Sequence, residues 1–170
     1  NSNLKWEETN TFNMGVDYGF FDNRVNGSFE LYQRDTKDLI NEVPVAAGTN
    51  FTNLLLTNIG NMRNRGVEFN VNYRAVSTEK LFCEFGANLT LNQNEITKLT
   101  MVDNPDYQGA VLGRISSGTG YYAKINSVGY PANSYFVYQQ VYWPNGKPVE
   151  GVYVDRNDDG VVNEKDKYHF

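Results

Sequence analysis

The stretch Thr11–Arg34, which reads TFNMGVDYGFFDNRVNGSFELYQR, decides the fold of this chain. From Phe12 to Phe20 every even position is apolar or aromatic, and every odd position is small or polar. A period of two gives a β-strand one apolar face and one polar face. The alternation restarts at Val25, after the short turn-forming break Phe21–Arg24. The stretch therefore predicts an antiparallel β-hairpin over about residues 10–34.

A second pair of alternating runs predicts another long hairpin, over about residues 66–92. Apolar residues occupy alternate positions from Val67 to Tyr73 and again from Leu81 to Leu91. The break between the two runs, Ala75–Lys80, is short enough for a tight connection. The second hairpin therefore repeats the arrangement of the first.

The remaining segments connect these hairpins or follow them. A third, shorter hairpin is predicted over about residues 135–154, with Pro144–Lys147 as its turn. Two long connections, residues 35–63 and 94–133, are expected to be loops. An Asp-rich loop over residues 155–166 closes the chain.

Composition excludes several classes of protein. Lys and Arg are scattered along a chain whose net charge is −5, so no nucleic-acid-binding patch is expected. Cys83 is the only cysteine, so no internal disulfide can form. No run approaches the ~18 apolar residues of a membrane helix. Because the chain begins at Asn1 and stops abruptly at Phe170, we expect residues 1–170 to be an excerpt of a longer protein.

Two all-β architectures fit the alternation. The alternating runs have the roughly 9–11 residues that a tilted strand needs to cross a bilayer. Short joins within pairs and long joins between them are typical of outer-membrane barrels, and polar faces rich in Asn, Thr, Ser, Glu and Gly suit a barrel lumen. A soluble β-sandwich also has alternating strands, so the pattern alone does not decide between the two.

Three stretches resemble known sequences. Asn3–Thr9, followed by Phe12–Tyr18, resembles the Asn-Pro-x-Leu-x-Trp-Glu opening in the C-terminal half of TonB-dependent outer-membrane transporters, with Ser2 where that family usually has Pro. Asn58–Phe69 is similar to their recurring Asn-x-Gly-x-Glu sequence at the start of a strand. The segment from Gly129 to Gly160 resembles one typical of the SusC/RagA branch.

This resemblance implies antiparallel hairpins from a large outer-membrane β-barrel, of the roughly 22-stranded plugged type, with long extracellular loops. Such proteins lie in the outer membrane of Gram-negative cells, surrounded by its lipid. They import large nutrients, usually oligosaccharides or peptides. The TonB system supplies the energy through regions outside this chain, and a SusD-like surface lipoprotein closes over the outer mouth. The alternative from another class is a secreted or surface carbohydrate-binding β-sandwich.

Loop length predicts the orientation of the hairpins in the membrane. The short breaks Phe21–Arg24 and Ala75–Lys80 are expected on the periplasmic side. The long connections 35–63 and 94–133 are then expected outside the cell, near the nutrient and the lipoprotein.

The Asp-rich loop has the spacing of a calcium-binding loop. Asp155, Asn157 and Asp159 stand at its positions 1, 3 and 5, and Gly160 stands at position 6, where the chain turns sharply. The complete set of expected ligands is Asp155, Asn157, Asp159, Val161 through its carbonyl, Asn163 and Asp166. Asp in place of Glu at position 12 shortens the reach of the last ligand. The alternative is an Asx-rich surface turn without a metal; bound Ca²⁺ would be structural.

Loop aromatics are the remaining candidates for ligand contact. Tyr107, Tyr121 and Tyr122 are able to stack on sugar rings, although anchoring at the membrane interface or packing within a loop is the commoner role of such residues. His169 is the only histidine, and no Ser/His/Asp or Cys/His set can be assembled. The sequence therefore predicts no catalytic residues and no enzyme.

Overall fold

The structure is a computed structural model that describes the chain except for residues 1–3, 45–47, 49–50, 52–53, 101–106 and 116–121. The chain divides into two compact units, Asn1–Val102 and Asp103–Phe170. Each unit is described by itself. The described residues form antiparallel β-strands and one 3₁₀ turn, which agrees with the predicted all-β class. None of the described helices is long and apolar enough to span a membrane.

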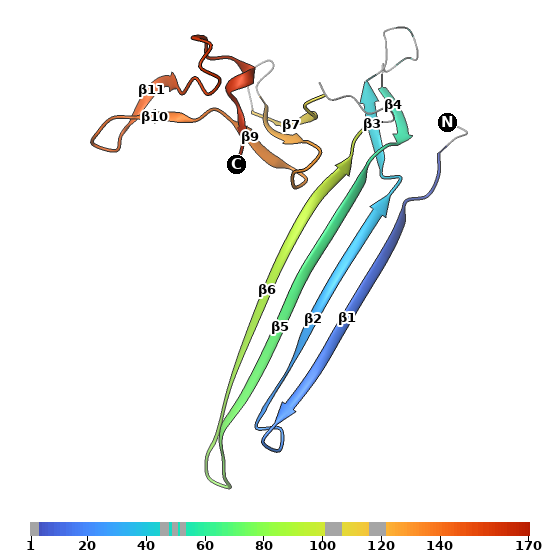
Figure 1. Ribbon diagram of the computed structural model, residues 1–170, viewed down its shortest axis with the longest axis vertical. Helices are drawn as coiled ribbons and strands as arrows, with labels where there is room; N and C mark the ends of the chain where they lie inside the picture. The colour runs from blue at the N-terminus through green and yellow to red at the C-terminus, as the bar shows by residue number, and fades with distance from the viewer. Residues whose placement is uncertain (1–3, 45–47, 49–50, 52–53, 101–106, 116–121) are drawn as a thin grey trace. The chain divides into compact units, whose positions relative to one another are not determined.

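Four long strands form the main sheet of the first unit, which we call the long sheet (Figure 1). They are β1 (Glu8–Phe20), β2 (Val25–Lys37), β5 (Asn61–Ser77) and β6 (Phe82–Lys98), in the order β1-β2-β5-β6. Both predicted long hairpins are present, as β1–β2 and β5–β6.

The strands of the long sheet extend beyond the predicted hairpins. The second hairpin, expected over 66–92, runs from Asn61 to Lys98. The backbone ladder needs only N–H and C=O groups, so it continues where the side chains no longer alternate between apolar and polar. Periodicity therefore marked only the central part of each strand.

The segment expected as a connecting loop over 35–63 contains a small hairpin of its own. Its strands are β3 (Ile40–Pro44) and β4 (Leu54–Asn58). The base of the hairpin is fixed by backbone hydrogen bonds from Ile59 N to Leu39 O (2.8 Å) and from Leu39 N to Gly60 O (3.1 Å). The expectation of an irregular loop was incomplete because strands of this length carry little periodicity.

The second unit contains two small sheets. One has the order β12-β9-β8-β7, built from β7 (Ala110–Arg114), β8 (Tyr122–Asn126), β9 (Ser134–Val137) and β12 (Tyr168–His169). The other pairs β10 (Gln140–Tyr142) with β11 (Pro148–Tyr153). A 3₁₀ turn, η1, spans Glu164–Asp166.

Two sequence expectations change in this unit. The third hairpin, predicted over 135–154, is confined to β10 and β11, because β9 pairs with β8 and β12 instead. The connection predicted as a loop over 94–133 contains the β7–β8 hairpin and the last residues of β6. The first difference arises because β9 pairs with the distant β12 and with β8, which alternation within one segment does not encode. The second arises because strands of five residues, such as β7 and β8, carry little periodicity.

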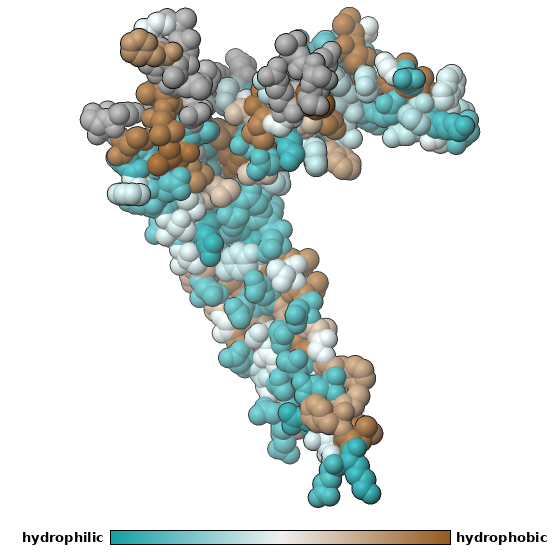
Figure 2. All heavy atoms as spheres, turned by 180° about the vertical axis from the view of Figure 1, so that it is seen from behind, coloured by the Kyte–Doolittle hydropathy of each residue, from teal (hydrophilic) through white to brown (hydrophobic). Residues whose placement is uncertain are grey.

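The long sheet has little buried core. Ile96 and Ile125, one in each unit, are the buried hydrophobic residues of the described chain. Many large apolar side chains of the long sheet remain exposed, including Phe12 (66%) and Phe85 (62%). Hydrophilic residues cover most of the face seen in Figure 2. A single layer with one exposed apolar face requires an apolar environment other than its own core.

Candidate functional site: the two faces of the long sheet and the Asp-rich loop

One face of the long sheet is a continuous apolar band. The register places Val16 beside Phe29, Phe29 beside Phe69, and Phe69 beside Leu89. The four rows of the band are Met14-Leu31-Val67-Leu91, Val16-Phe29-Phe69-Leu89, Tyr18-Gly27-Val71-Ala87 and Phe20-Val25-Tyr73-Phe85. An apolar face that is continuous across four strands fits the outside of a membrane barrel.

The height of the apolar band agrees with a membrane. From Met14 to Phe20, β1 runs about 20 Å at ~3.4 Å per residue. At a strand tilt of about 40° this length covers about 16 Å of membrane thickness, the greater part of the roughly 25 Å band of outer-membrane barrels.

The opposite face of the long sheet, which we call the polar face, carries hydrogen-bonding side chains. Asn70 Nδ2 donates to Asn88 Oδ1 (2.9 Å), and Asn72 Nδ2 donates to Asn70 Oδ1 (3.1 Å). Glu30 and Glu68 are register neighbours on this face. Such a wall exchanges hydrogen bonds with water and polar solutes, as a barrel lumen requires.

A tyrosine crosses the polar face over a glycine. Tyr32 on β2 donates its hydroxyl hydrogen to Asn92 Oδ1 on β6, although β5 lies between them. Gly66 is the β5 residue in that row, and a Cβ built on it would lie 2.6 Å from the Tyr32 ring. The contact therefore depends on a residue without a side chain. It was not expected from the sequence, because only the register shows that Tyr32 and Gly66 are neighbours.

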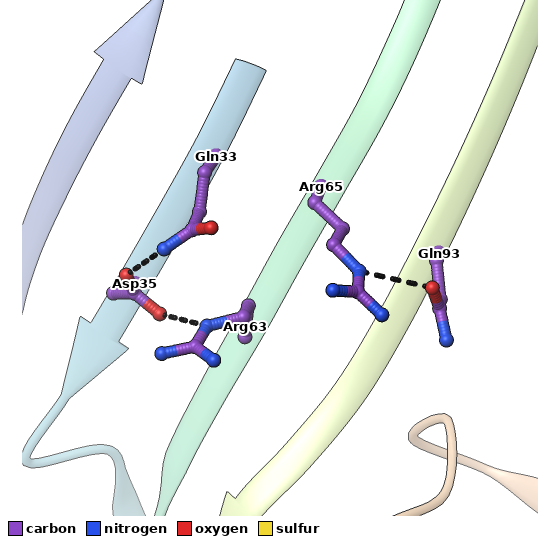
Figure 3. A network of polar contacts seen from close by, with 5 residues as sticks. All are labelled: Gln33, Asp35, Arg63, Arg65 and Gln93. Atoms are coloured by element: carbon purple, nitrogen blue, oxygen red, sulfur yellow. Dashed lines mark hydrogen bonds and ion pairs between the residues drawn. The ribbon is translucent and has the colours of Figure 1, made fainter. Parts of the chain in front are cut away.

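A polar network, drawn in Figure 3, lies in the rows next to the apolar band, and the register places it on the same side of the sheet. Arg63 Nε donates to Asp35 Oδ1 (2.7 Å), and Gln33 Nε2 donates to Asp35 Oδ2 (2.7 Å). In the neighbouring pair, Arg65 Nε donates to Gln93 Oε1 (2.9 Å). These residues continue the alternation of the apolar band toward the end of the strands that carries the long connections.

In the first half of the Asp-rich loop, side chains of the loop accept hydrogen bonds from the loop's own backbone. Asp155 accepts hydrogen bonds from the backbone N–H groups of Asp158 (2.8 Å) and Gly160 (2.7 Å). Asn157 Oδ1 accepts from Asp159 N (3.0 Å), and Asp159 Oδ1 accepts from Val161 N (2.9 Å). The three predicted ligands at positions 1, 3 and 5 therefore all fold back onto the loop backbone.

The second half of the loop is closed by Asp166, which is fully buried. Its Oδ1 accepts from the backbone N–H groups of Arg156 (2.8 Å) and Asn157 (3.3 Å), and its Oδ2 accepts from Asn163 N (2.7 Å). Asn163 caps the 3₁₀ turn in return, since its Oδ1 accepts from Lys165 N (2.9 Å). The structure thus brings positions 2, 3 and 9 of the predicted calcium loop onto Asp166 at position 12.

The described residues contain no group of three or more His, Cys, Asp or Glu side chains placed to hold a metal ion. Hydrogen bonds of this kind are also typical of an Asx-rich turn. Both oxygens of Asp155 and the Oδ2 of Asp166 each accept one backbone N–H and keep a further lone pair, so these bonds are compatible with either role of the loop. Calcium binding therefore stays a prediction.

Acid should loosen this loop. The backbone hydrogen bond from Asn163, with those from Arg156 and Asn157, holds the pKa of Asp166 below its usual value of 3.8, against the opposing effect of burial. A carboxyl whose pKa is lower in the folded state contributes stability above its unfolded pKa and loses it as the pH falls through its folded pKa. We expect hydrogen-exchange protection of the loop amides to be full well above pH 3.8 and to fall progressively below it.

The variant Asp166→Asn is the control for this prediction, because an amide does not titrate in that range. Protection of the amides of Arg156, Asn157 and Asn163 should already be reduced in this variant, with little further change on acidification. Equal protection of the wild-type loop at both extremes would contradict the assignment.

The structure does not bring together the two predicted loop tyrosines that it describes, Tyr107 and Tyr122. Tyr107 precedes β7 and is 43% exposed, whereas Tyr122 begins β8 and is half-buried. Ala110 pairs with Asn126 and Arg114 pairs with Tyr122, so the two tyrosines belong to opposite ends of the β7–β8 hairpin. Tyr121 lies outside the described residues. A sugar-stacking role of these residues stays a prediction.

His169 packs against aromatic rings rather than against catalytic partners. Its ring stacks on Tyr130, with centroids 3.5 Å apart, and lies 5.1 Å from Phe136. Burial lowers the pKa of His169. The residue therefore lies among aromatic side chains.

Comparisons with known proteins agree with a barrel wall that has the apolar band on one face and the polar face on the other. Residues 1–168 match the family model described as TonB dependent receptor-like, beta-barrel. The chain is 45% identical to the TonB-dependent receptor SusC of Bacteroides thetaiotaomicron over all its 170 residues, which are 17% of that protein. It is 33% identical over 112 residues, 66% of this chain, to the TonB-dependent receptor P39 of Formosa agariphila, of which the match covers 11%.

Solved structures show the same likeness. The structure of the RagAB peptide transporter superposes on the whole chain with a TM-score of 0.73 and 25% sequence identity, over 18% of that protein chain. The chain therefore spans less than a fifth of the length of these relatives. The β-sandwich alternative is wrong, because the match is to a barrel and the apolar face of the long sheet is exposed rather than covered by a second sheet.

Proposed function

The chain belongs to the TonB-dependent receptor-like β-barrel family, and we propose on this premise that it is part of the wall of a transporter that imports large nutrients across the outer membrane. Proteins of this kind are outer-membrane transporters and not enzymes. The observation that carries the proposal is the division of the long sheet into an unbroken apolar band and a polar face. A barrel with such a wall meets lipid outside and a solvated passage inside.

Two classes of cargo are proposed, oligosaccharides and peptides. The resemblance of the sequence to the SusC/RagA branch, whose members usually import oligosaccharides or peptides, supports both classes, and the chain is 45% identical to the receptor SusC. Similarity to a structure described as a peptide transporter supports the second, at 25% identity. The polar face offers amide and carboxylate groups, which hydrogen-bond to either class.

The partners are part of the same proposal. A SusD-like surface lipoprotein would close over the outer mouth of the barrel, next to the connections 35–63 and 94–133. The TonB complex would act through regions of the protein outside this chain. Outer-membrane lipid would cover the apolar band.

Uptake by cells that carry or lack the full-length receptor tests this function. Cells with the receptor gene deleted should fail to take up one class of cargo, either fluorescently labelled oligosaccharides or labelled peptides. A plasmid copy should restore uptake, and removal of TonB should abolish it again. The full-length protein should migrate far above 19.3 kDa in the outer-membrane fraction, with a different mobility when unboiled. Unchanged uptake of both classes after deletion would refute the proposal.

We also propose that the Asp-rich loop binds Ca²⁺ and that the bound ion stabilises the folded loop. The support is the spacing of its oxygen ligands and the hydrogen bonds that bring both halves of the loop onto Asp166. In calorimetry with the full-length receptor, millimolar Ca²⁺ should release or absorb heat, and Asp155→Ala should remove that signal. The matched control is Asp158→Ala, since Asp158 stands at position 4 of the loop and is not among the expected ligands. No heat with the wild-type protein would leave the Asx-rich turn as the explanation.

A further inference from the structure

On the side of the long sheet that carries the apolar band, the side chains change from apolar to polar between two neighbouring rows. The last apolar row contains Met14, Leu31, Val67 and Leu91. The next row in the direction of the long connections is Phe12-Gln33-Arg65-Gln93, and the row beyond it is Asn10-Asp35-Arg63-Glu95. Because side chains two residues apart share a face, all three rows point to the same side as the apolar band.

This boundary lies at the external end of the membrane-spanning strands. The tight turns that join β1 to β2 and β5 to β6 are at the other end of the sheet (Figure 1). Outer-membrane barrels keep short turns on the periplasmic side and long connections outside. The row that contains Arg65 is therefore at the level of the headgroups of the external leaflet.

Arg65 is held in place by Gln93 and forms no ion pair with a carboxylate of the described residues. Its Nε donates to Gln93 Oε1 at 2.9 Å, and its side chain is exposed. Arg63, by contrast, is paired with Asp35 at 2.7 Å. Among the ion pairs of the described residues, none involves Arg65, so its positive charge remains available next to the apolar band. Figure 3 shows its hydrogen bond to Gln93 beside the paired Arg63 and Asp35.

A groove lies beside this guanidinium. It has a volume of about 460 Å³, and its lining includes Phe12, Leu31, Val67 and Leu91 together with Arg65 and Gln93. Apolar side chains toward the membrane and a cation at the headgroup level fit an amphiphile with an acyl chain and an anionic headgroup.

We propose that Arg65 and Gln93 bind the phosphate of a phosphorylated lipid of the external leaflet, with an acyl chain along the groove. A guanidinium with one N–H held in place presents its remaining donors to a phosphate in a fixed geometry. The carboxylates of Asp35 and Glu95 lie one row further from the apolar band, and Asp35 is already paired with Arg63. Cargo in the barrel lumen meets the opposite face of the sheet, so this site is separate from transport.

Binding of monophosphoryl lipid A to the purified full-length receptor in detergent tests the proposal, with the dephosphorylated lipid as the comparison. We expect wild-type receptor to prefer the phosphorylated form by roughly tenfold, the effect of one charge-assisted hydrogen bond. Arg65→Gln should remove this preference, and Arg65→Lys should retain part of it, because a lysine keeps the charge but not the planar donors.

Arg34→Gln is the matched control, since Arg34 lies at nearly the same height but on the polar face. This variant should keep the full preference for the phosphorylated lipid. Equal preference in wild type and Arg65→Gln, or an equal loss in Arg34→Gln, would overturn the proposal. Complete displacement of the lipid by millimolar inorganic phosphate would also overturn it, because the groove would then contribute nothing.

Discussion

Replacing Phe69 with arginine is expected to prevent most of the full-length receptor from reaching its folded state in the outer membrane. Phe69 lies in the Val16-Phe29-Phe69-Leu89 row of the apolar band, and its ring stacks on Tyr18 with centroids 6.2 Å apart. An arginine that faces lipid near the bilayer midplane costs about 2–4 kcal/mol. The loss of the phenylalanine contacts adds to this cost.

The neighbouring substitution Asn70→Arg provides the control. Asn70 is the next residue of β5 and lies on the polar face, where a charge remains solvated. The measurement is the amount of folded receptor in outer-membrane fractions, detected on gels with an antibody to this segment. Folded receptor is recognised because its gel mobility without boiling differs from its mobility after boiling. Phe69→Arg should lose most of that species, and Asn70→Arg should retain it. If only Asn70→Arg lost the folded receptor, the polar face rather than the apolar band would face the lipid.

Substituting Gly27 with alanine is expected to force β2 and β5 apart locally. A Cβ on Gly27 would clash with the carbonyl oxygen of Asn70 and lie 2.7 Å from the hydroxyl oxygen of Tyr18. That hydroxyl donates to the same Asn70 carbonyl at 2.8 Å, so the added methyl group disturbs both the ladder and the tyrosine. Overpacking of this kind lowers the free energy of unfolding by about 1–3 kcal/mol.

Gly15→Ala separates this effect from a general sensitivity of the strands to glycine replacement. A Cβ on Gly15 would meet Glu30 Cγ at 3.2 Å, and a flexible glutamate side chain is able to move aside. The midpoint of urea unfolding of the full-length barrel should fall for Gly27→Ala and change little for Gly15→Ala. Equal midpoints for both variants would show that β2 and β5 have room for a side chain at Gly27.

The membrane-facing part of the fold was readable from the sequence because lipid and lumen impose opposite chemistry on successive residues. Alternation from Phe12 to Phe20 and from Val67 to Tyr73 predicted both long hairpins and the residues on each face. The predicted strands were too short. Arg63 and Arg65 are polar but lie on the side of the apolar band, so the apolar alternation ends there although the backbone pairing of the strands continues.

The Asp-rich loop shows where sequence reasoning about a site stops. Spacing alone identified Asp155, Asn157, Asp159 and Asp166 as a set. The structure adds that Asp166 is buried and accepts three backbone hydrogen bonds from the two halves of the loop. Spacing cannot contain this information, since the bonds depend on how the loop closes in space.

The sequence by itself determined the all-β class, the two long hairpins and the division between an apolar and a polar face. These properties are local, because each follows from which residues stand two positions apart. Tertiary structure alone decided the register, which aligns Val16, Phe29, Phe69 and Leu89 in one row and places Tyr32 over Gly66. It also decided that Arg65 stands beside the apolar band without a carboxylate partner among the described ion pairs. Register is set between strands that are far apart in the chain, so no single segment of sequence encodes it.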